Sequence, residues 1–118
     1  MKYMLIIYDN EKVWNDMPEA QKGQLFGEYM SFTDGIKKSG HYVSGAPLQP
    51  VSTATSVRVR EGKTLKTDGP FAETREQLGG YYMIEAKDLD EACKIAARIP
   101  SSRIGTIEVR PVMEIPGA

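Results

Sequence analysis

Cysteine and histidine are nearly absent from this sequence of 118 residues, which contains only Cys93 and His41. A single cysteine excludes a disulfide within the chain. The two residues together also exclude a zinc site that one chain builds from four cysteines, or from two cysteines and two histidines. A zinc site of mixed ligands would have to depend on carboxylates. We therefore expect neither a metal nor another cofactor.

Long apolar segments and a surplus of one charge are also missing. The longest apolar run, residues 3–8, is much shorter than a membrane span, and a polar stretch follows it instead of the cleavage site of a secretory signal. Fifteen Lys and Arg residues against sixteen Asp and Glu residues leave a formal net charge of -1. This balance argues against nucleic-acid binding through bulk positive charge. We expect a cytoplasmic protein with neither nucleic acid nor a membrane as a partner.

The length and composition are those of one globular domain over residues 1–118. The chain weighs 13.1 kDa, and hydrophobic and charged residues make up 41% and 26% of it. Surface scaling gives an accessible area of about 6,400 Å² for the folded chain, against about 19,000 Å² for the unfolded chain. A core can therefore form without disulfides or a structural metal.

Two helices are expected from apolar residues at helical spacing. The first is expected to begin near Asp16, because Glu19 completes a capping-box pattern, and to end at Gly40. The second has the same pattern at Asp88 and is expected to end before Pro100. Along this second helix an apolar stripe predicts buried side chains at Leu89, Ala92, Cys93 and Ala96.

Strands alternate with these helices, and residues 9–17 are expected to form a polar loop that carries Trp14. A hairpin with one solvent-exposed face is expected around the turn at Glu61 and Gly62. The predicted strands cover residues 2–8, 41–45, 56–60, 63–67, 81–85 and 106–114. This order predicts a ferredoxin-like α+β sandwich with an inserted β-hairpin and loop.

Two of the predicted strands are apolar on both alternating sets of side chains. They cover residues 3–8 and 81–85. The two helices cover only one face of the sheet, so the second face must be buried by the inserted segment or by another subunit. A homodimer that packs sheet face against sheet face is the economical solution, since two-fold symmetric dimers are the commonest assembly.

The irregular segment at residues 68–80 gathers carboxylates, an arginine, glycines and a proline. One interpretation is structural: Asp68, Gly69 and Pro70 form a turn, and Phe71 fills a gap in the core. The other is functional, because long irregular segments in small domains often carry binding sites. The residues alone favour the structural interpretation.

Several blocks of the sequence carry a resemblance to a known family. They read MKYMLIIY at the start, DGPFAETRE at residues 68–76, QLGGYYMIE at 77–85, DLDEA at 88–92 and IEVRP at 107–111. The chain closely resembles the DGPF-domain branch of the YCII-related family over nearly its whole length. The resemblance implies a ferredoxin-like α+β fold and a dimeric α/β-barrel type of assembly. Some relatives lie beside sigma factors, which suggests a regulatory setting.

The resemblance also implies where a site would lie. In the broader YCII-like group, a His–Asp pair in a cleft is the proposed enzyme site, with its histidine on the first helix. This chain has no histidine there, and the residues near that place are Glu28 and Tyr29. The aspartate of the pair corresponds best to Asp68. Many relatives carry a histidine before the last strand, where this chain has Arg103. We expect His41 to have a structural role at a helix C-terminus.

A catalytic mechanism in this chain would have to use carboxylates and tyrosines. Asp68 would accept the proton, with its pKa raised by desolvation beside Phe71. Arg110 would bind a substrate carboxylate, or it would form ion pairs in a buried dimer face. Cys93 is interpreted as a small core residue. The tentative ligand-binding residues are Tyr8, Phe71, Glu73, Tyr82 and Arg110.

Three functions from different classes remain open at this point. The first is a small-molecule-binding or accessory protein with a cleft near the DGPF loop. The second is a small enzyme that uses Asp68 for acid–base chemistry on a metabolite. The third is an interaction module linked to sigma-factor regulation. The expected partners are a second copy of the chain, through the sheet face, and a small-molecule ligand.

Overall fold

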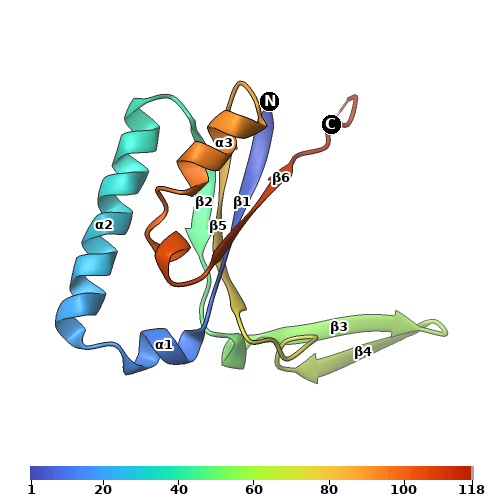
Figure 1. The fold of residues 1–118 in the computed structure, drawn as a ribbon. Helices are drawn as coiled ribbons and strands as arrows, with labels where there is room; N and C mark the ends of the chain where they lie inside the picture. Colours follow the sequence, from blue (N-terminus) through green and yellow to red (C-terminus); the bar gives the residue numbers. More distant parts are fainter. Residues whose placement is uncertain (118) are drawn as a thin grey trace.

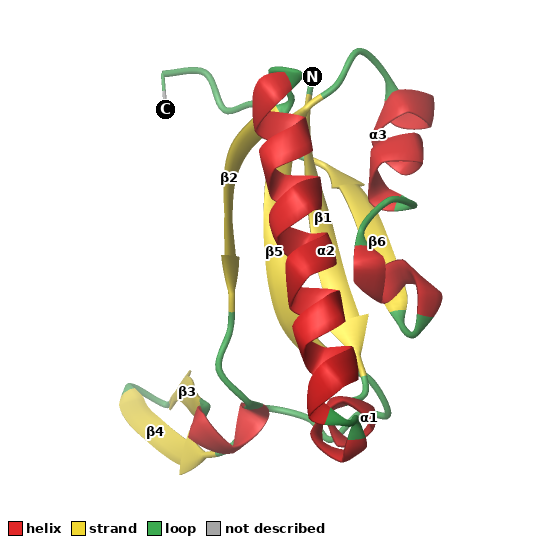
Figure 2. Cartoon of the chain, turned by 90° about the vertical axis from the view of Figure 1, so that its left-hand side faces the viewer, coloured by secondary structure: helices red, strands yellow, loops and turns green. Residues whose placement is uncertain are grey.

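The computed structural model describes residues 1–117 and has a four-stranded antiparallel sheet as its centre. Two helices, α2 (Glu19–Lys38) and α3 (Leu89–Ala96), lie on one face of this sheet (Figure 2). The strand order β2-β5-β1-β6 is that of the ferredoxin-like α+β fold, with which the structure is consistent. The strands are β1 (Lys2–Asp9), β2 (Tyr42–Pro47), β5 (Gln77–Glu85) and β6 (Thr106–Pro111).

The core lies between this sheet and the helices. Tyr3, Leu5 and Ile7 alternate along β1 toward the helix side, where all three are buried. Their neighbours on β5 are Ile84 and Tyr82, which pair with Tyr3 and Leu5 in the sheet register. The helices contribute Phe32, Ile36, Ala92, Ile95 and Ala96 to the same core cluster. Side chains at alternate positions of β1 thus pack against the apolar faces of the helices, whose side chains recur every 3.6 residues.

The predicted loop at residues 9–17 contains a short helix, α1 (Glu11–Asp16), which carries Trp14. Asn10 caps it, since its side-chain oxygen accepts a hydrogen bond from the Lys12 N–H at 2.9 Å. The predicted start of the long helix near Asp16 is therefore wrong. That helix, α2, begins at Glu19 after Pro18, which provides no side-chain cap.

The predicted start of α3 is confirmed, but the predicted set of buried side chains along it is wrong in part. Asp88 caps the helix through a 2.9 Å hydrogen bond from the Glu91 N–H. The buried residues are Ala92, Ile95 and Ala96, whereas Leu89 and Cys93 are exposed. The prediction of Cys93 as a core residue is therefore wrong, because α3 presents a slightly rotated face to the sheet.

The predicted hairpin is present as β3 (Thr55–Arg60) and β4 (Lys63–Asp68). Its turn residues Glu61 and Gly62 have φ angles of 51° and 76°, the left-handed conformation that a tight hairpin turn needs. The hairpin stands away from the main sheet (Figure 1), with a short 3-10 helix, η1 (Val51–Thr53), before it. Both of its faces are exposed, so the prediction of a single solvent-exposed face is wrong for this chain.

Within residues 1–117, neither a helix nor the inserted segment lies on the second face of the main sheet (Figures 1 and 2). Its apolar side chains are only half-buried: Met4, Ile6, Tyr8, Tyr81 and Met83. Glu108 and Arg110 of β6 pair with Ile6 and Met4 and continue the same face. The alternative that the inserted segment covers this face is wrong for the single chain, because the hairpin projects past the sheet instead of folding over it (Figure 1).

Across residues 1–117, no helix combines the length and the apolar composition that crossing a bilayer requires.

Candidate functional site

An apolar cleft of about 530 Å³ opens on the helix side of the sheet. Trp14 of α1, together with Phe26 and Met30 of α2, forms the outer wall. Ile7 and Tyr82 form the floor, where β1 and β5 lie side by side. The volume is in the range of pockets that bind small molecules.

Glycines allow the strands at the floor of the cleft to approach closely. A Cβ atom on Gly45 of β2 would lie 2.8 Å from Cδ1 of Tyr82, and one on Gly80 of β5 would lie 2.9 Å from the carbonyl oxygen of Ala46. Real Cβ atoms essentially never make contacts this short. The two glycines therefore keep β2 against the Tyr82 ring and shape this part of the cleft.

Three polar side chains from distant parts of the sequence form a hydrogen-bonded chain in the cleft. The hydroxyl of Tyr29 donates to Oγ of Ser101 at 2.6 Å. Ser101 in turn donates to Oδ2 of Asp9 at 3.2 Å. Asp9 ends β1, Tyr29 lies on α2, and Ser101 lies in the short 3-10 helix η2 (Pro100–Arg103) that follows α3. Ser101 is only 2% exposed, so its hydroxyl is fixed between the other two groups.

The surroundings shift the titration of two members of this chain. Burial raises the pKa of the Asp9 carboxyl, and the nearby charges of Glu11 and Glu76 raise it further, while the Ser101 hydrogen bond partly opposes the change. Burial also raises the pKa of the Tyr29 hydroxyl. Asp9 is thus the carboxyl group in the cleft that takes up a proton more readily than a surface aspartate, and Tyr29 remains a hydrogen-bond donor.

A second polar pair, Thr33 and Tyr82, also lines the cleft. The Thr33 hydroxyl donates to the backbone oxygen of Tyr29 at 2.9 Å and lies 2.7 Å from the Tyr82 hydroxyl. Because the Thr33 hydrogen is already used, Tyr82 donates to Thr33 and keeps its own lone pairs free as acceptors. Burial raises the pKa of Tyr82 as well.

Glu11 connects three segments at the rim of the cleft through hydrogen bonds. Its backbone N–H donates to Oε1 of Gln77 at 3.0 Å, and its own Oε2 accepts a hydrogen bond from the Val51 N–H at 3.0 Å. These contacts fix α1 to β5 and η1. None of the cleft-lining residues in the described part of the chain is Lys or Arg, whereas Asp9 and Glu11 are acidic. The cleft therefore disfavours an anionic ligand.

The sequence-predicted site residues are spread over three regions. Tyr82 lines the cleft. Tyr8 and Arg110 belong to the second face of the sheet. Asp68 ends the hairpin, and Phe71 and Glu73 follow it, all three exposed.

Asp68 and Phe71 do not form the buried pair expected from the sequence: both are exposed, Phe71 by 82%. Asp9 and Ser101 were missed by sequence reasoning. One feature of the sequence could have indicated Asp9: it is a carboxylate at the end of a strand that is apolar on both faces. Binding and catalytic residues commonly lie where a strand passes into a loop.

Two residues singled out by the resemblance have other partners. Nδ1 of His41 lies 2.6 Å from the Ser39 hydroxyl, and Nε2 lies 3.3 Å from Glu91, which matches a structural role at the end of α2. Arg103 forms an ion pair with Glu28 of α2. In the described residues no group of three or more His, Cys, Asp or Glu side chains is placed to hold a metal ion.

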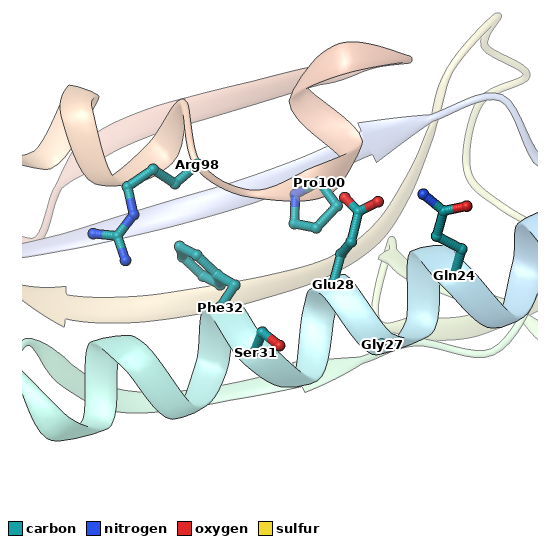
Figure 3. A pocket seen from close by; sticks show the side chains of 7 residues that line it. All are labelled: Gln24, Gly27, Glu28, Ser31, Phe32, Arg98 and Pro100. Carbon is teal, nitrogen blue, oxygen red and sulfur yellow. The ribbon is translucent and has the colours of Figure 1, made fainter.

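A second hollow is polar and open to solvent. It runs between α2, which contributes Gln24, Glu28 and Ser31, and the segment after α3, which contributes Arg98 and Pro100 (Figure 3). The Arg98 guanidinium lies 5.6 Å from the centre of the Phe32 ring, over its face. The cleft at Asp9 is the stronger candidate site, because it combines apolar walls with a half-buried carboxyl group.

Comparisons with known proteins agree with the fold. A model of the YCII-related domain matches residues 1–116. An uncharacterised protein of Rhizobium meliloti (strain 1021) is 32% identical over 114 residues, which are 95% of this chain and 92% of that protein. A solved structure from Burkholderia phenoliruptrix, 5-chloro-2-hydroxyhydroquinone dehydrochlorinase in complex with 2,5-dihydroxybenzoquinone, superposes with a TM-score of 0.56 at 11% identity. That match covers 96% of this chain and 94% of the other. The chain therefore belongs to the YCII-related domain family.

Proposed function

We propose that this protein binds a small, neutral, hydroxylated ring compound in the cleft and that the carboxyl group of Asp9 exchanges a proton with it. The observation that carries this proposal is the half-buried Asp9 carboxyl, with its raised pKa, at an apolar cleft of about 530 Å³. A carboxyl group in such a setting is suited to acid–base chemistry.

The lining supports the choice of ligand class. Trp14, Phe26 and Met30 offer flat or adaptable apolar surface to a ring. Asp9 and Tyr82 offer acceptor oxygens to its hydroxyl groups. The solved structure of similar fold holds 2,5-dihydroxybenzoquinone, also a hydroxylated six-membered ring, and this supports a ring of that size as a probe.

The proton step follows from the hydrogen bonds around Asp9. The ionised carboxylate accepts a hydroxyl proton of the ligand, and the Ser101 hydroxyl stabilises the carboxylate before transfer. Tyr29 holds Ser101 in the orientation that donates to Asp9. We therefore propose Asp9 for the acid–base role, in place of the Asp68 expected from the sequence.

Trp14, the single tryptophan, provides a direct test of ligand binding. Hydroquinone is expected to quench its fluorescence with saturation, at a dissociation constant below about 1 mM, and benzoate is not. Met30→Lys, at the cleft wall, is expected to weaken hydroquinone binding at least tenfold. Gln24→Lys is the matched control on the same helix, since Gln24 faces the open polar hollow. Linear quenching equal to that of free N-acetyltryptophanamide would contradict the proposal.

Ser101→Ala tests the hydrogen bond to Asp9. Hydroquinone affinity is expected to rise with pH through the Asp9 pKa, because the ionised carboxylate is the better acceptor. The Ser101 hydrogen bond lowers that pKa, so Ser101→Ala is expected to move the midpoint of the affinity profile to higher pH. Ser102→Ala is the control, since its hydroxyl donates to the backbone oxygen of Ala97 instead. A midpoint that stays in place or moves down would refute this role of Ser101.

We also propose that a second copy of the chain covers the open sheet face. The half-buried side chains Met4, Ile6 and Met83, together with Tyr8 and Tyr81, form an apolar surface of the kind that subunit interfaces bury. Arg110 and Glu108, on the same face, would form ion pairs within that interface.

A further inference from the structure

The hairpin β3–β4, residues 55–68, is here called the arm. Ser56 is its one half-buried residue, and the rest of it is exposed. Val57 and Val59 lie on one of its faces, and their side chains are 58% and 59% exposed. Arg58 and Arg60 alternate with them on the opposite face. In the hairpin register Val57 pairs with Lys66 and Val59 with Thr64, so the two valines share their face with these side chains, whereas Leu65 lies with Arg58 on the other face. The valine face thus presents two exposed apolar side chains, and the other face presents three cationic ones, Arg58, Arg60 and Lys63.

A hairpin of two strands is marginally stable in water by itself. Six-residue strands that keep the regular register Thr55↔Asp68 to Arg60↔Lys63 need a surface against which to pack. The loop directly after the arm exposes a further large apolar side chain, Phe71, at 82%. Arm and loop together thus expose four large apolar side chains: Val57, Val59, Leu65 and Phe71.

The direction in which the arm extends indicates which molecule packs against it. The helices lie on one side of the main sheet, and the arm extends toward the other side, where the sheet face is open (Figures 1 and 2). The open sheet face and the arm are thus two adjoining surfaces that lie at an angle to each other. A molecule that packs on the open sheet face meets the arm as well.

The dimensions support a large covering partner. The chain exposes 8453 Å², about 2,000 Å² more than the scaling for a compact monomer of this mass gives. Its radius of gyration is 16.4 Å, against about 13.5 Å for a compact chain of this length. A stable interface buries about 800 Å² on each partner. The excess is enough for an interface that includes both the sheet face and the arm.

We propose that the arm packs its Val57–Val59 face on a second copy of this chain, so that each copy of a two-fold dimer is held by the arm of the other. This inference rests on the homodimer proposed above, and it adds the segment that stabilises it. Two-fold symmetry makes both arm contacts equivalent and closes the assembly at two copies.

The dimer dissociation constant of the full chain, measured by sedimentation, tests the arm. Wild type is expected to sediment at twice the chain mass of 13.1 kDa at micromolar concentration. Val57→Asn with Val59→Asn is expected to raise the dissociation constant at least tenfold. Arg58→Asn with Arg60→Asn is the matched control on the other face of the same strand, and it is expected to leave the constant unchanged.

Amide hydrogen exchange of wild type gives a second measurement that needs no variant. Arm amides are expected to be protected at high protein concentration and to lose that protection on dilution below the dissociation constant. Exchange that is independent of concentration would overturn the proposal, as would arm amides that gain protection only when duplex DNA is added to a monomeric protein.

The outcomes separate the arm from the proposals on which it rests. A monomeric wild type overturns both the homodimer and the arm. A dimer that the valine substitutions leave unchanged overturns the arm alone. Hydroquinone binding at the cleft is read from Trp14 on the helix side, so its failure would leave the sedimentation result for the arm intact.

Discussion

Asp9→Asn is expected to remove acid–base chemistry from the cleft without weakening the fold at pH 7. Asparagine keeps the side-chain shape and an oxygen that accepts the Ser101 hydrogen bond. It cannot take up a proton, so hydroquinone affinity should lose its pH dependence, and any turnover that uses this proton should fall about 10²- to 10⁴-fold. Trp14 fluorescence titrations across pH measure the first effect.

The stability effect of Asp9→Asn follows from the sign of the pKa shift. The pKa of Asp9 is raised in the folded chain above the ordinary value of 3.8, so the folded state binds the proton more tightly than the unfolded state. Wild-type stability therefore falls as pH rises from about the ordinary value through the raised one, and it stays reduced above it. Asp9→Asn has no carboxyl group at this position, so its stability does not fall with pH for this reason. Its urea midpoint should equal or exceed that of wild type at pH 7, and the difference should shrink at acid pH.

The matched control for this substitution is Asp16→Asn, at an exposed carboxyl at the end of α1. It is expected to leave the pH dependence of hydroquinone binding intact. A loss of more than about 1 kcal/mol at pH 7 for Asp9→Asn would mean that the carboxylate supports the fold. Asp9 would then be structural, and the proton step would lose its residue.

Gly105→Ala is expected to destabilise the chain by about 3 kcal/mol, the upper part of the range for overpacked sites. A Cβ atom at this position would overlap the carbonyl oxygen of Tyr8 and lie 2.9 Å and 3.0 Å from Cβ and Cα of Asp9. Two of these three neighbours are backbone atoms, so no flexible side chain can move aside. The strand end that carries Asp9 would have to shift away from Ser101, and hydroquinone affinity should fall with the urea midpoint.

The matched control is Gly27→Ala in the middle of α2, where no atom lies within 4 Å of the added Cβ. Alanine is a better helix former than glycine, so this variant is expected to gain up to about 1 kcal/mol. Urea midpoints that fall equally for both variants would contradict the close approach at Gly105.

The sequence determined the features that depend on neighbouring residues. Two-sided apolar strands, the Asp88 cap of α3 and the turn at Glu61 and Gly62 each follow from a pattern within a few positions, and the structure contains all three. The blocks of sequence that carry the family resemblance can likewise be read from neighbouring residues alone. These features required no knowledge of which segments meet, because period and capping act within one element.

Only the tertiary structure decided which polar groups form the site. Asp9 and Ser101 are 92 positions apart, and Tyr29 and Ser101 are 72 apart, yet they share one chain of hydrogen bonds. Asp68 belongs to a dense motif but ends an exposed hairpin, whereas Asp9 stands in an ordinary turn sequence and is half-buried. The physical reason is that a carboxyl pKa depends on the atoms packed around it in space, and long-range packing, not local sequence, places those atoms.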